Sequence, residues 1–85
     1  MIEQIDRFRE LLISGKKGGN FYLPTATGRI VQLNYTRDPI TKRYILQCRD
    51  GHQMLWVSNS SVSKDLVKDF DEIIYQYTDV WKQKQ

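Results

Sequence analysis

The dipeptide Asp50–Gly51, set between two stretches of alternating apolar and polar residues, constrains the fold of this chain more than any other feature. Asp-Gly in such a setting is the strongest short-range signal for a β-hairpin with a two-residue type I′ turn. It predicts two antiparallel strands in which residues that face each other share one surface of the sheet. Counting outward from the turn pairs Arg49 with His52, Cys48 with Gln53, Leu46 with Leu55 and Tyr44 with Val57.

A second hairpin is predicted directly before the first. Residues 29–37 alternate in the same way, and Asp38–Pro39 marks a turn because proline fixes the first corner. Closing this turn with Arg37 opposite Lys42 brings the apolar residues of both hairpins to one surface, and a slip of one residue would undo this agreement. The predicted core surface consists of Val31, Leu33, Tyr35, Tyr44, Leu46, Cys48, Leu55 and Val57.

Amphipathic helices are predicted at both ends of the chain. In residues 2–13 and 63–82, apolar residues recur at steps of three and four, which is typical of a helix with one buried face. A two-helix coiled coil is the competing interpretation of the second segment, but its apolar stripe is wider than a coiled-coil seam requires. This stripe comprises Leu66, Val67, Phe70, Ile73, Ile74, Tyr77, Val80 and Trp81.

Together these elements predict a small α+β protein. We expect a single domain over residues 1–85 with the order α-β-β-β-α, a three-stranded antiparallel meander and both helices packed on one face. Residues 20–28 either add a fourth strand or cover the core.

The residue content argues against catalysis. The chain has one histidine, His52, and one cysteine, Cys48, and the predicted register points them to opposite faces. This excludes a zinc site or a Cys–His nucleophile pair, and the acidic residues follow one helix face instead of converging. We expect no enzymatic activity, no metal and no cofactor.

Without a secretory signal, a spanning apolar run or a second cysteine, we also expect a cytoplasmic protein with no membrane partner.

The charge is unevenly distributed along the chain. The net charge is +3, yet residues 14–62 hold seven basic and only two acidic residues. Such an excess favours a polyanionic partner, although basic residues that serve only solubility are the simpler alternative.

The candidate site is the sheet surface opposite the predicted core. Aromatic and guanidinium groups stack on bases, and amides hydrogen-bond to base edges, so this surface is suited to nucleic acid. Its predicted members are Gln32, Asn34, Thr36, Arg43, Ile45, Gln47, Arg49, His52, Met54 and Trp56. Basic loop residues that would meet phosphates are Lys16, Lys17, Arg37 and Lys42.

The leading hypothesis is a non-enzymatic binding module that contacts nucleic acid or a nucleic-acid machine, as a regulatory or accessory protein of a bacterium or phage. The alternative is a protein-binding regulator or inhibitor, since Trp and Arg are favoured at protein interfaces. It would use the Trp56 surface or the acidic stripe of the last helix, which comprises Asp65, Asp69, Glu72 and Asp79. A third interpretation makes Trp56 an ordinary core residue under another segment of the chain. Both a monomer and a homodimer are compatible with the sequence.

Overall fold

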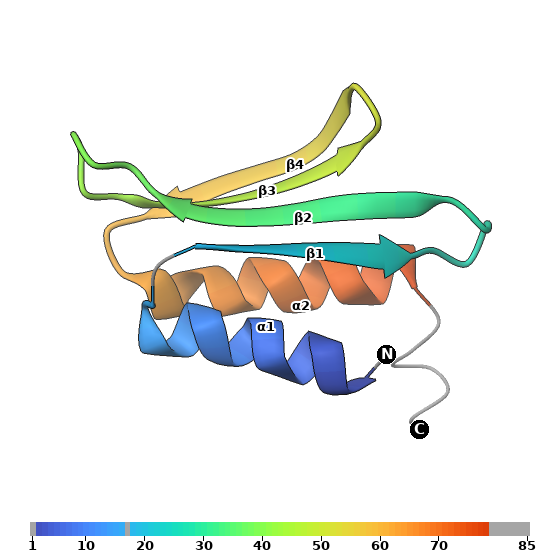
Figure 1. The fold of residues 1–85 in the computed structure, drawn as a ribbon, viewed down its shortest axis with the longest axis horizontal. Helices are drawn as coiled ribbons and strands as arrows, with labels where there is room; N and C mark the ends of the chain where they lie inside the picture. The colour runs from blue at the N-terminus through green and yellow to red at the C-terminus, as the bar shows by residue number, and fades with distance from the viewer. Residues whose placement is uncertain (1, 17, 79–85) are drawn as a thin grey trace.

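The computed structural model describes residues 2–16 and 18–78. An antiparallel sheet with the strand order β1-β2-β3-β4 forms one layer, and both helices form a second layer on one of its faces (Figure 1). The elements are α1 (Ile2–Ser14), β1 (Gly19–Pro24), β2 (Ile30–Arg37), β3 (Tyr44–Asp50), β4 (Gln53–Ser60), the 3₁₀ turn η1 (Ser63–Asp65) and α2 (Leu66–Tyr77). The predicted α+β class is confirmed, and the segment that the sequence left open forms a fourth strand.

The core lies between the two layers. Helix α1 packs against β1, and α2 packs against β3 and β4. Phe8 is central, because its ring stacks on Phe70 at a centroid distance of 5.2 Å and lies 5.9 Å from the ring of Phe21. Burying a large apolar side chain stabilises the fold by roughly 1.5–3 kcal/mol. The buried apolar residues are Ile5, Phe8, Leu12, Phe21, Leu23, Val31, Leu33, Tyr35, Leu46, Cys48, Leu66, Phe70, Ile73 and Ile74.

The helices follow the predicted periodicity. Helix α1 ends one residue beyond the predicted boundary. Helix α2 ends at Tyr77, earlier than predicted, because Thr78 adopts an extended backbone with φ −132°. The Thr78 hydroxyl and N–H both donate to the carbonyl of Ile74, which satisfies an acceptor at the helix end. The predicted stripe residues Val80 and Trp81 lie outside the described residues.

The first predicted hairpin register is wrong by two residues. Arg37 faces Tyr44, not Lys42, because residues 38–43 form a longer loop than the sequence suggested. The Asp38 carboxylate holds this loop by accepting from the N–H of Ile40 at 2.8 Å. A shift of two residues keeps every side chain on its predicted face, so the core assignments in β2 and β3 are correct.

The second predicted hairpin differs in a way that changes faces. The loop consists of Gly51 and His52, so Asp50 faces Gln53 and the predicted type I′ turn at Asp50–Gly51 is wrong. Within this loop Gly51 has φ +60°, whereas His52 does not have a positive φ, as in a type II′ turn. This shift of two residues would by itself have preserved the faces.

A β-bulge at Leu55 then exchanges the two faces of β4. Arg49 faces Met54, but the next residue of β3, Cys48, faces Trp56, so Leu55 is the extra residue. Trp56 therefore lies on the helix side and packs against the core, and its Nε1–H donates to Ser58 Oγ at 2.8 Å. The prediction that Trp56 lies on the outer surface is wrong. Val57, predicted as core, instead faces outward and is 55% exposed.

Candidate functional site

No described helix or loop covers the sheet face opposite α1 and α2, which we call the open face. Its members follow from the strand pairing, since residues that face each other across antiparallel strands share a surface. The open face consists of Asn20, Tyr22, Pro24, Ile30, Gln32, Asn34, Thr36, Ile45, Gln47, Arg49, Met54, Val57 and Asn59.

One row of side chains across the open face combines three chemistries. Tyr22 faces Gln32, and Gln32 faces Arg49, so a phenol, an amide and a guanidinium stand on neighbouring strands. Neighbouring strands are about 4.8 Å apart, so one bound base or side chain can touch two members of the row. Tyr22 is 64% exposed, so its ring is open for stacking.

The adjacent row carries amides. Asn20 faces Asn34, and Asn34 faces Gln47. The side chain of Asn34 donates from Nδ2 to Asn20 Oδ1, which leaves the second Asn34 N–H and the Asn20 amide N–H groups available to a ligand. The row ends on β4 at Val57.

The open face carries positive but no negative side chains in the described strands. Arg49 points outward, and Arg43 reaches the same face from the β2–β3 loop, where its Nε–H donates to Asn59 Oδ1 at 2.8 Å. Among residues 2–16 and 18–78, no carboxylate lies within ion-pair distance of either arginine. The acidic residue of β3, Asp50, lies on the other side of the sheet, where Arg29 binds it at 3.0 Å. Within the described residues, an anion on this face would meet no carboxylate.

The structure brings together about half of the predicted site. Gln32, Asn34, Gln47, Arg49 and Met54 lie on the open face, and Arg43 lies at one end of it. His52 is exposed at the tip of the β3–β4 hairpin, and Trp56 lies on the opposite side.

The predicted phosphate-binding loop residues are not on the open face. The Arg37 guanidinium lies over the ring of Tyr44, 5.3 Å from its centroid, on the helix side of the sheet. Arg37 and Lys42 line a concavity with Gly15 beyond the end of α1, and Lys16 follows Gly15 in the chain. Lys17 lies outside the described residues.

The site predicted from the sequence lacks Tyr22 and Asn20, because it was left open whether residues 20–28 form a strand. The alternation was present in the sequence, since Asn20 and Tyr22 carry polar groups whereas Phe21 and Leu23 are wholly apolar. Phe21 and Leu23 are buried, which turns the two residues that alternate with them outward.

The nucleophilic and metal-ligating groups are dispersed. Cys48 is buried, and this desolvation raises the pKa of its thiol to about 11, which keeps it protonated and unreactive at neutral pH. Within the part of the chain that the structure describes, no three His, Cys, Asp or Glu side chains come together as a metal site would require.

Two further findings concern the chain as a whole. None of the helices in the described ranges has the length and apolar character needed to cross a membrane. Comparisons with protein families, with curated proteins and with solved structures found no match to this chain.

Proposed function

We propose that this protein is a non-enzymatic binding module whose open face contacts single-stranded nucleic acid. The observation that carries the proposal is the composition of that face, which in the described strands combines an exposed tyrosine, a patch of amides and two arginines without a carboxylate. Exposed bases stack on aromatic rings, amides hydrogen-bond to base edges, and arginines neutralise phosphates. A regulatory or accessory role is compatible with this chemistry.

Single strands suit this surface better than a duplex. Tyr22 stands beside Gln32 on the flat open face of the sheet, where a base must be unstacked to reach it. A duplex presents stacked bases whose edges are accessible only in the grooves, and a four-stranded sheet face is too wide to enter a groove about 12 Å across. The protein would therefore read unpaired bases.

Charge reversal on the open face tests the proposal. We expect Arg43→Glu combined with Arg49→Glu to abolish the binding of a fluorescent oligothymidylate or oligouridylate, measured by anisotropy. The matched control is Lys64→Glu combined with Lys68→Glu, which makes the same change in net charge at exposed residues of η1 and α2. Equal loss of binding in both double variants, or no loss in either, would refute a nucleic-acid site on the open face.

The salt dependence separates phosphate contacts from other contacts. Each phosphate neutralised on a single strand contributes about 0.7 to the slope of log affinity against log salt. Replacing one arginine with glutamine should therefore lower the slope by about that amount. Tyr22→Ala should instead weaken binding by about fivefold to one hundredfold at an unchanged slope, because stacking involves no counterion release.

A protein partner on the same face is the second candidate. Four large apolar side chains on the open face are at least 46% exposed, namely Tyr22, Ile30, Met54 and Val57. Aromatic residues, methionine and arginine are enriched at protein interfaces. Such a partner would bind with little dependence on salt, and Val57→Asp or Ile30→Asp would remove its binding.

A further inference from the structure

Strand β1 is an edge strand, and most of its free edge is unprotected against pairing. Among the described residues it pairs only with β2, over six consecutive residues without interruption. The free edge of such a strand presents backbone N–H and C=O groups that another strand can use. Proteins usually block such edges with charges, prolines or bulges. The opposite edge, β4, has the bulge at Leu55, but Gly19–Pro24 contains neither a bulge nor a charged residue, and its proline, Pro24, stands at the end of the strand.

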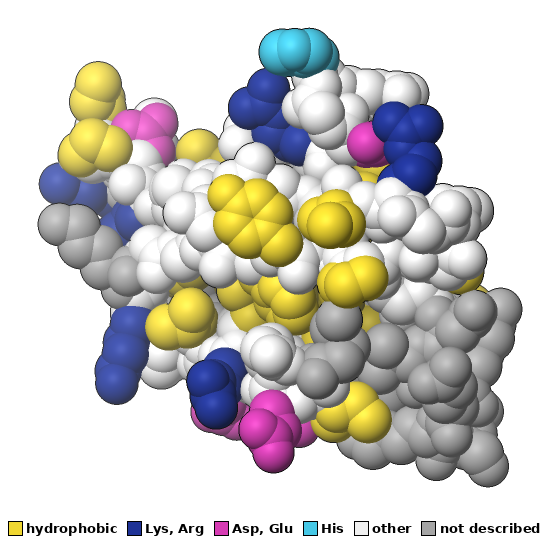
Figure 2. Space-filling view, turned by 45° about the vertical axis from the view of Figure 1, so that its right-hand side comes forward, with side chains coloured by type: hydrophobic (Ala, Val, Ile, Leu, Met, Phe, Trp, Pro, Cys, Tyr) yellow, Lys and Arg dark blue, Asp and Glu magenta, His cyan; other side chains and the backbone are white. Residues whose placement is uncertain are grey.

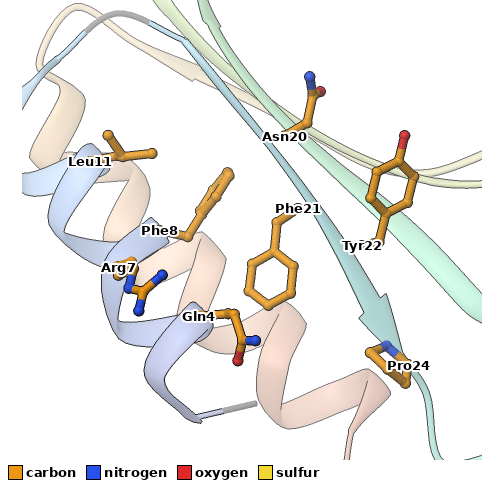
Figure 3. Close-up of a pocket in the computed structure, with 8 residues that line it drawn as sticks. All are labelled: Gln4, Arg7, Phe8, Leu11, Asn20, Phe21, Tyr22 and Pro24. Carbon is orange, nitrogen blue, oxygen red and sulfur yellow. The ribbon is translucent and has the colours of Figure 1, made fainter.

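A groove of about 440 Å³ runs beside this edge, between β1 and α1. Figure 2 shows hydrophobic side chains around a hollow in the middle of this side of the molecule, with most charged side chains toward the margins. In Figure 3, Phe8 and Phe21 lie between the helix and the strand, whereas Asn20 and Tyr22 point away from the helix. Phe8, Leu11 and Phe21 therefore form an apolar floor directly beside unpaired backbone groups.

The geometry favours a single extended segment over a second copy of the chain. A strand added to β1 would lie about 4.8 Å from it, above α1. A second copy pairing through its own β1 would bring its α1 into the same region, whereas packed helices need interaxial distances of about 8–10 Å. A lone strand brings no helix and avoids this conflict.

The charge of the groove specifies the segment further. Arg7 is the one charged residue among those that line the groove, and its side chain is 79% exposed. Its carboxylate partner within the described chain is Glu3, at 4.0 Å and 87% exposed, which is a weak contact. A carboxylate on the bound segment would complement Arg7.

We propose that β1 and α1 bind an extended segment of a partner protein, which adds to the sheet beside β1. One of its apolar side chains enters the groove over Phe8, Leu11 and Phe21, and an acidic side chain meets Arg7. Backbone pairing supplies affinity and the groove supplies specificity, as in other cases of strand addition. This site adjoins the open face along β1, where Asn20 and Tyr22 belong to both, and its test contains no nucleic acid.

Selection from a phage-displayed library of random peptides tests the inference. We expect the selected peptides to alternate apolar with polar residues and to contain an acidic residue. The best peptide, made synthetically, should shift the backbone amide resonances of residues 19–23 in the ¹⁵N-labelled full chain. Methylating those peptide nitrogens that face β1 should abolish binding, whereas methylating the alternate nitrogens should not.

Charge reversal in the groove provides the second arm. Arg7→Glu should weaken the selected peptide by about three- to tenfold, the range of an exposed ion pair turned into a repulsion. The control Lys68→Glu makes the same charge change on α2, outside the groove, and should leave affinity unchanged. The exposure of Arg7 makes loss of folding an unsuitable explanation, and circular dichroism checks this.

Three results would overturn the inference. One is a library that yields no peptide with alternating sensitivity to N-methylation. Another is a peptide whose resonance shifts are confined to β3 and β4. The third is sedimentation that shows a dimer of the free protein with the β1 amides protected from exchange, because a second copy would then occupy the edge.

Discussion

At the scale of single residues, a buried chain of hydrogen bonds joins three elements of the fold. Ser63 Oγ donates to the carbonyl of Leu12 at 2.6 Å and lies 2.5 Å from the hydroxyl of Tyr35. Since a serine hydroxyl has one hydrogen, Tyr35 must be the donor to Ser63. The chain therefore fixes η1 against both α1 and β2.

This order of donors predicts unequal costs for two small substitutions. Ser63→Ala leaves both the Tyr35 hydroxyl and the Leu12 carbonyl buried without this partner, which should lower the free energy of unfolding by about 2–3 kcal/mol. Tyr35→Phe keeps the bond from Ser63 to Leu12 and should cost about 1 kcal/mol. Urea unfolding of the two variants measures both values. Equal costs, or a larger cost for Tyr35→Phe, would show that the donor order is different.

Cys48 gives a prediction that depends on pH. Burial raises the pKa of its thiol from 9.0 to about 11, so the unfolded chain loses this proton at a lower pH than the folded chain. The contribution of Cys48 to stability is therefore complete below pH 9 and should be lost as the pH rises through 9–11. Comparing the stability of the unmodified chain with that of Cys48→Ala at each pH separates the contribution of Cys48 from that of Tyr35, whose pKa is also raised by burial. A thiol reagent at pH 8 should modify the native protein only after unfolding; rapid modification would contradict this burial.

At the scale of elements, the β-bulge at Leu55 decides which side of the sheet holds the indole of Trp56. In the variant Trp81→Phe, where Trp56 is the remaining tryptophan, we expect blue-shifted emission and weaker acrylamide quenching than in urea. An emission maximum that does not move on unfolding would mean that the indole is already exposed to water in the folded protein. This result would contradict the bulge at Leu55.

The bulge at Leu55 also explains where the sheet faces predicted from the sequence differ from those in the structure. Alternation in β2 and β3 predicted their faces correctly, because a register error of two residues leaves every side chain on its side. A bulge inserts one residue, and no composition signal in Met54–Leu55–Trp56 marks it. The part of the site on β2 and β3 was therefore predictable. On β4 the prediction is correct for Met54, before the bulge, and wrong for Trp56, after it, while β1 was left open although its alternation was readable.

At the scale of the whole molecule, charge is divided between the two layers. Described residues 18–62, which contain the sheet, carry five basic and two acidic residues, whereas residues 2–14 and 63–78 of the helical layer carry four basic and seven acidic residues. Arg43 and Arg49 are the members of this basic excess that lie on the open side of the sheet, so a polyanion would be drawn to that side and repelled by the acidic helices. The open face is the part of that side where aromatic, amide and guanidinium groups also meet.

Nucleic-acid binding by the open face is tested most directly on the side-chain amides of that face. The side-chain NH₂ resonances of Asn20, Gln32, Asn34 and Gln47 are separate signals in a ¹⁵N spectrum, and a short oligouridylate can be titrated against them. We predict that these signals and the Arg49 Nε–H signal shift together and saturate, while those of Gln4 on α1 and Gln76 on α2 do not move. Shifts confined to the helical layer, or none at all at low salt, would contradict the claim that the open face binds nucleic acid.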